Sequence, residues 1–133
     1  MSKIKVSYDK IDKIVFILAM YESNIFRKII QGIIPCQKIW EDTHTLCFKD
    51  ITPKAPIHVL LIPKGDYQDA LRFYKNASVE EILSFQKGMV AVVELLGLGK
   101  HGFRAIMNQG DYGKQEVLHF HVHILGEKNE NSC

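Results

Sequence analysis

Apolar and polar positions alternate most regularly near the end of the chain, over residues 119–125. Three histidines alternate there with three large apolar residues. The apolar residues are Phe120, Val122 and Ile124, and the histidines are His119, His121 and His123. Because successive side chains of a strand point to opposite faces, the pattern predicts a strand with its apolar side chains in the core. The other face of that strand would carry the three imidazoles side by side.

The rest of the pattern predicts short strands and two main helices. Ser78 to Glu81 has the form of a capping box, and apolar residues at three- and four-residue steps predict a helix over 78–96. A shorter helix is predicted from Asn24 to Gly32, and residues 64–77 form a connection with one or two helical turns. Strands over 38–40, 45–48, 58–62 and 102–107 then join the histidine strand in a mostly antiparallel five-stranded sheet. This order is typical of an α+β fold, here with its helices on one face.

Length and composition predict one globular domain. The chain has 133 residues with a net charge of +2, and its basic residues are dispersed, which argues against a nucleic-acid surface. Its apolar runs are too short to span a bilayer, and its three cysteines are widely spaced, so we expect reduced thiols, a cytoplasmic location and no membrane partner. We expect residues 1–22 to be an extension without an assigned role, 23–126 the domain, and 127–133 a short polar tail.

A row of imidazoles favours two kinds of chemistry. A neutral imidazole can attack phosphorus, while its neighbours donate protons or orient the nucleophile. The glycine-bearing loop over residues 108–117 directly precedes the histidines and would place amides around phosphate oxygens. Alternatively, His119 with His123, or His121 with His58, could chelate zinc. No Asp or Glu has ligand spacing to these histidines in the sequence, which weighs against a metal.

The alternation of His with apolar residues resembles the signature of the histidine triad family of nucleotide hydrolases and transferases. The opening helix, the segment from Asp50 to Pro63 and the loop over 108–117 also match, so the resemblance covers residues 23–126. The opening helix and short tail are most similar to the Hint-like branch. The resemblance implies a HIT-like α+β fold, a homodimer, and hydrolysis of purine nucleoside 5′-phosphoramidates to AMP or GMP without a metal or cofactor.

The resemblance also assigns roles to residues. His121 would attack the α-phosphorus and become transiently nucleotidylated, His123 would assist at the phosphate oxygens, and His119 with His58 would maintain the hydrogen-bond order. Asp50 would accept the ribose hydroxyls, and Asn108 would contact the nucleotide. The expected nucleotide-binding residues are Phe26, Ile29 and Ile34 around the base, together with Asp50, Ile51, Asn108, Gln115 and Glu116.

One position departs from the family pattern. Glu116 stands three residues before the first triad histidine, where the family often has Ser or Thr. An ionised carboxylate cannot donate a hydrogen bond to phosphate. Glu116 therefore points away, binds a cationic leaving group, or lowers the rate. The alternative functions are a dinucleoside polyphosphate hydrolase, a nucleotide- or partner-binding protein with little turnover, and a His-ligated metal hydrolase.

Overall fold

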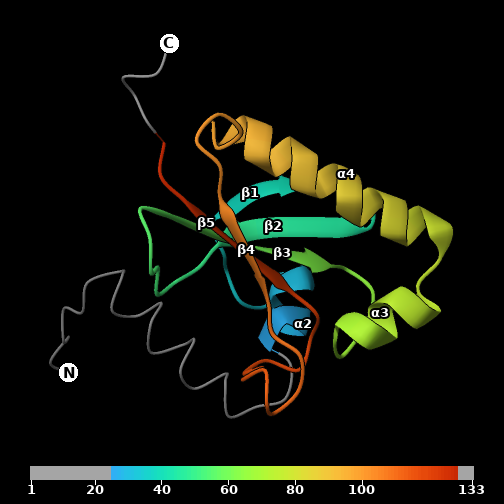
Figure 1. The fold of residues 1–133 in the computed structure, drawn as a ribbon. Helices are drawn as coiled ribbons and strands as arrows, with labels where there is room; N and C mark the ends of the chain where they lie inside the picture. The colour runs from blue at the N-terminus through green and yellow to red at the C-terminus, as the bar shows by residue number, and fades with distance from the viewer. Residues whose placement is uncertain (1–24, 129–133) are drawn as a thin grey trace, which may run out of the picture.

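A five-stranded antiparallel sheet forms the centre of the computed structural model, which describes residues 25–128 (Figure 1). The strands are β1 (Lys38–Glu41), β2 (Thr45–Lys49), β3 (Ile57–Pro63), β4 (Arg104–Met107) and β5 (Val122–Gly126). Their order in the sheet is β1-β2-β3-β5-β4, and every neighbouring pair is antiparallel. The predicted α+β class and five-stranded sheet are confirmed. The expected extension over residues 1–22 lies outside the described residues.

Helices cover both faces of this sheet, so the prediction of helices on one face is wrong. The described helices are α2 (Ile25–Ile30), α3 (Ala70–Asn76) and α4 (Val79–Leu95). Figure 1 shows α4 and α2 on opposite sides of the sheet. The reason is that β2 and β3 are apolar on both faces: Cys47 and Leu61 pack with α4, whereas Phe48 and Leu60 pack with α2. No helix within residues 25–128 is long and apolar enough to cross a membrane.

Two local signals of the sequence are realised as helix starts. The Ser78 hydroxyl accepts a hydrogen bond from the Glu81 amide at 3.1 Å, and the Glu81 carboxylate accepts one from the Ser78 amide, which completes the capping box of α4. The connection over residues 64–77 contains α3, whose N-cap is Asp69. The expected one or two helical turns are therefore confirmed, and they form a short third helix among the described residues.

The histidine segment differs from the predicted strand. β5 begins only at Val122, so His119 and His121 precede it. β4 ends opposite Val122, at Met107, and the Phe120 amide instead donates to the Tyr67 carbonyl at 2.7 Å. The alternation of faces nevertheless holds through the irregular part, because the three apolar side chains of this segment all pack in the α4-side core. The histidines accordingly lie towards the α2 side of the sheet.

Candidate active site

A pocket of about 300 Å³ lies on the α2 side of the sheet, and its volume is at the lower end for small-molecule sites. It is lined by Phe26, Asp50, Thr52, Lys54, His58, Leu60, Ile106, Asn108, Lys114, Glu116, Val117, His121, His123 and Leu125. Three of the four expected catalytic histidines thus reach one pocket. His119 is fully buried beside it and is not part of the lining.

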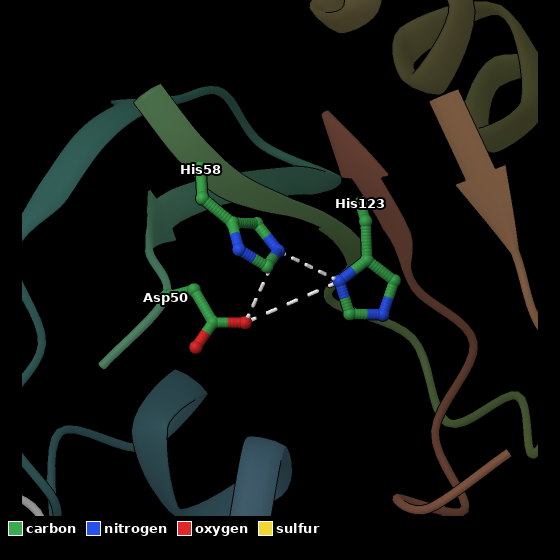
Figure 2. A group of neighbouring side chains, drawn as sticks. All are labelled: Asp50, His58 and His123. Carbon is green, nitrogen blue, oxygen red and sulfur yellow. Dashed lines mark hydrogen bonds and ion pairs between the residues drawn. The ribbon is translucent and has the colours of Figure 1, made fainter. Parts of the chain in front are cut away.

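Strand register brings His58 and His123 together. In the antiparallel pair of β3 and β5, Leu60 lies opposite His123, and His58 lies opposite Leu125. The two histidines are therefore diagonal neighbours on the same face, within reach of each other's rings. Nε2 of His58 and Nδ1 of His123 are 2.9 Å apart (Figure 2).

The backbone fixes the direction of this hydrogen bond. The Lys54 amide donates to Nδ1 of His58 at 3.0 Å, so neutral His58 carries its proton on Nε2. That N–H donates to Nδ1 of His123. The proton of neutral His123 is therefore on Nε2. Burial lowers the pKa of both rings and so favours their neutral forms, although the Asp50 carboxylate acts in the opposite direction.

His121 has the opposite tautomer. Its Nδ1 lies 2.7 Å from the carbonyl oxygen of His119, and since a carbonyl only accepts, Nδ1 carries the proton. Nε2 therefore keeps a free electron pair. Burial lowers the pKa of His121 to about 4, so the ring is neutral at pH 7. The edge of this ring packs against Phe26, with the ring centroids 5.1 Å apart.

His119 supports the site from within the core. Its Nε2–H donates to the Pro63 carbonyl at 2.8 Å, and its Nδ1 has no hydrogen-bond partner among residues 25–128. Burial lowers the pKa of His119 to about 4 as well. Its backbone carbonyl, rather than its side chain, makes the contact that orients His121.

The Asp50 carboxylate lies beside the His58–His123 pair, with Oδ2 3.3 Å from Nε2 of His58 (Figure 2). Ligand atoms of these three residues lie within 4.8 Å of one another, close enough to surround a metal ion. The sequence offers no Asp or Glu with ligand spacing to these histidines, but folding brings Asp50 to them, so that argument against a metal does not hold. The donor set nevertheless fits a metal poorly, since a metal on Nε2 of His58 would need the ring proton on Nδ1, which already accepts from the Lys54 amide.

The structure brings only some of the expected nucleotide-binding residues to the pocket. Phe26, Asp50, Asn108 and Glu116 line it. Ile29, Ile34, Ile51 and Gln115 do not. Ile29 is buried in the α2-side core and Ile34 packs against that core. Gln115 is occupied within the protein, since its side-chain amide donates to the Gln68 and Val117 carbonyls and its oxygen accepts from the Gly110 amide.

The loop before the histidines is closed by its own hydrogen bonds. The Asn108 side chain donates to the Gly113 carbonyl at 2.7 Å, and the Gln115 amide donates to the Gly110 carbonyl at 3.0 Å. Within it, Lys114 has a φ of 59°, in the left-handed region that non-glycine residues rarely adopt. Lys114 and Glu116 both line the pocket, so each lies at the site.

Sequence reasoning missed Thr52 and Lys54 as pocket residues. Thr52 donates to Oδ1 of Asp50 from its amide at 2.8 Å and from its hydroxyl at 3.2 Å, the arrangement of an Asx turn. The Asp-x-Thr spacing could have indicated this turn. Nothing in the sequence indicated that the backbone of Lys54 would contact the His58 ring four residues later.

Comparison with known proteins agrees with this site. The HIT domain family model matches residues 31–130. An uncharacterized HIT-like protein of Rickettsia prowazekii is 42% identical over 107 residues, which cover 80% of this chain and 89% of that protein. The adenylylsulfatase HINT1 of Arabidopsis thaliana is 41% identical over 112 residues, covering 80% and 73% of the two chains.

Solved structures agree as well. A histidine triad nucleotide-binding protein from Candida albicans superimposes with a TM-score of 0.71 at 32% identity, covering 81% of this chain and 77% of that one. The sequence match, the sheet and the histidine pocket lead to the same conclusion: the chain belongs to the histidine triad (HIT) family.

Proposed function

We propose that the protein is a Hint-like hydrolase that cleaves purine nucleoside 5′-phosphoramidates and releases AMP or GMP. The observation that carries this proposal is the tautomer of His121. Its Nδ1–H is held by the His119 carbonyl, its Nε2 has a free electron pair, and its pKa of about 4 keeps that pair available at neutral pH. A neutral, oriented imidazole in a pocket is the requirement for nucleophilic attack on phosphorus.

The reaction proceeds in two displacements. Nε2 of His121 forms a bond to the α-phosphorus as the bond from phosphorus to the leaving nitrogen breaks; that nitrogen keeps the electron pair and takes up a proton from solvent, to which the attacking water later returns one. Water then attacks phosphorus and Nε2 departs with its electron pair. Over both steps one water is consumed, with its hydroxyl bound to phosphorus and its proton on the amine. The ring of the intermediate is positively charged, and the His119 carbonyl that accepts its Nδ1–H stabilises this charge.

Other pocket residues hold the substrate. The Nε2–H of His123 donates to a phosphate oxygen, where negative charge develops in the transition state. Phe26 packs against the purine, Asp50 accepts from the ribose, and Asn108 contacts the phosphate from the loop. Two related proteins support the chemistry: the Arabidopsis protein is an adenylylsulfatase and the Candida protein is nucleotide-binding.

The test is hydrolysis of a fluorescent adenosine phosphoramidate by the purified protein in EDTA. We expect turnover with release of AMP. Turnover that appears only after zinc is added would favour a metal hydrolase built on Asp50, His58 and His123. Retention of AMP without turnover under either condition would favour a nucleotide-binding protein. Faster cleavage of diadenosine polyphosphates than of phosphoramidates would favour a dinucleoside polyphosphate hydrolase.

The homodimer is also part of this proposal. β4 is an edge strand of the sheet, and two apolar side chains at its ends, Phe103 and Met107, are 41% and 46% exposed. An exposed edge strand can pair with a second copy of itself. Light scattering after gel filtration should give twice the mass of the chain, and a monomer at tens of micromolar would contradict the proposal.

A further inference from the structure

The Asp50 carboxylate is more enclosed than a ribose ligand needs to be. Its side chain is only 9% exposed. Oδ1 accepts two hydrogen bonds from Thr52, which fixes the plane of the carboxylate. Oδ2 is thereby aimed at the His58–His123 pair, 3.3 Å from Nε2 of His58 and 4.0 Å from Nδ1 of His123 (Figure 2).

This position affects the proton of His58. A carboxylate oxygen attracts an N–H and repels the electron pair of an unprotonated nitrogen. Oδ2 of Asp50 therefore favours the tautomer with the proton on Nε2. The Lys54 amide favours the same tautomer from the other side of the ring, because it donates to Nδ1. Two independent contacts thus fix one proton.

The fixed proton determines what His123 can do. With Nε2–H of His58 donating to its Nδ1, His123 must present Nε2–H as a donor. If His58 carried its proton on Nδ1, the hydrogen bond would reverse and His123 would present an electron pair instead. An electron pair would repel the phosphate oxygen that the proposed reaction requires His123 to stabilise. Two neighbouring side chains cannot take over this role, because His121 is held in its own tautomer by the His119 carbonyl and Ile106 of β4 is apolar.

We propose that Asp50 is a positioning residue that locks the tautomer of His58 and, through it, makes His123 a hydrogen-bond donor to the phosphate. This inference rests on the proposed function and assigns Asp50 a role besides ribose binding. Residues that orient a functional histidine through a hydrogen bond commonly change activity by about 10- to 100-fold when replaced.

The experiment separates the two roles by removing the ribose hydroxyls. The native protein and Asp50→Asn are compared on alkyl phosphoramidates of adenosine and of 2′,3′-dideoxyadenosine. The asparagine can turn its NH₂ group towards His58 and so favour the wrong tautomer. On the dideoxy substrate we expect Asp50→Asn to lower kcat about 10- to 100-fold and to change KM less than about 2-fold. Loss of activity confined to the adenosine substrate would overturn the tautomer role.

A matched control and a spectroscopic measurement complete the test. Glu80→Gln, at an exposed position in the first turn of α4, makes the same carboxylate-to-amide change outside the pocket, so it should keep the native kcat on both substrates. In the native protein, ¹⁵N NMR of labelled histidines should show His58 and His123 both protonated on Nε2. A proton on Nδ1 of His123 would overturn the inference, even if Asp50→Asn does not fold. Absence of turnover by the native protein would refute the proposed function, whereas the NMR result would still decide the tautomers.

Discussion

Hydrogen-bond direction gives four chemically identical side chains four different roles. Carbonyl acceptors place the proton of His121 on Nδ1 and that of His119 on Nε2. A backbone donor places the proton of His58 on Nε2, and His58 then determines His123. Of the three histidines in the pocket, only His121 is left with an unprotonated nitrogen that no protein group occupies, and this supports the proposal that it is the nucleophile.

His121→Ala should therefore remove turnover, by about three orders of magnitude or more, because no other group replaces the nucleophile. AMP binding should persist, since the variant removes no charge at pH 7. An alkaline quench with a labelled phosphoramidate, which preserves the acid-labile bond between phosphorus and the histidine nitrogen, should trap the nucleotidyl adduct on the native protein and not on the variant. His101→Ala, at an exposed position beyond α4, is the control and should behave as native. Labelled adduct on His121→Ala would refute this nucleophile.

Lys114 should show opposite effects on stability and binding. Replacing it by glycine relieves a left-handed backbone conformation and should raise the free energy of unfolding by roughly 0.5–1 kcal/mol. The same change removes an ammonium group from the pocket, so affinity for AMP should fall. Lys114→Met keeps the backbone conformation but not the charge, and should lose affinity without gaining stability. Calorimetry of AMP binding and urea unfolding measure both effects. Native affinity in Lys114→Met would exclude a phosphate contact.

At the scale of elements, the alternation around β5 places apolar side chains in the core and histidines on the opposite face of the sheet. Phe120 is 1% exposed, and its ring packs 5.1 Å from those of Phe73 and Phe85. Phe120→Ala should lower the free energy of unfolding by about 3–5 kcal/mol. Leu118→Ala, two residues earlier and half exposed, should cost less than about 1 kcal/mol. Urea unfolding compares the two, and equal midpoints would mean that the segment faces the other way.

Elements with local signals were predictable from the sequence. The capping box at Ser78 and the helical stripe gave α4 nearly to its ends, and the alternation gave the correct face for Phe120. The start of β5 was not predictable, because a strand needs a partner and β4 ends opposite Val122. Helices on both faces were missed because a continuous apolar run such as β3 shows no preferred face.

The sequence predicts several of the residues at the site but not the contacts between them. The spacing of the histidines predicts that they share one site. The approach of Asp50 to His58, by contrast, depends on the loop between β2 and β3. Gln115 has the spacing of a ligand and yet holds the loop together. A glutamine in this loop could contact a substrate or other protein groups, and the conformation of the folded loop over residues 108–117 determines which of these it does.

For the whole molecule, the buried histidines couple folding to pH. His119 and His121 have a pKa of about 4 in the folded state, against about 6.5 for an unfolded chain. Between these values the unfolded chain binds more protons than the folded one, so acid favours unfolding. The stabilisation is complete above about pH 7, is lost progressively as the pH falls through 6.5, and levels off below about pH 4. Each histidine contributes up to about 3 kcal/mol of this change.

His119→Gln isolates one of these contributions. The glutamine amide can still donate to the Pro63 carbonyl but does not titrate. Urea unfolding of both proteins at pH 7.5, 6 and 5 gives the free energy of unfolding. As the pH falls, this free energy should decrease less for the variant than for the native protein, so the two values should converge. Carboxylates titrate alike in both proteins, so they cancel in the difference. Parallel curves would mean that His119 is already protonated in the fold, which its unpartnered Nδ1 in an apolar core argues against.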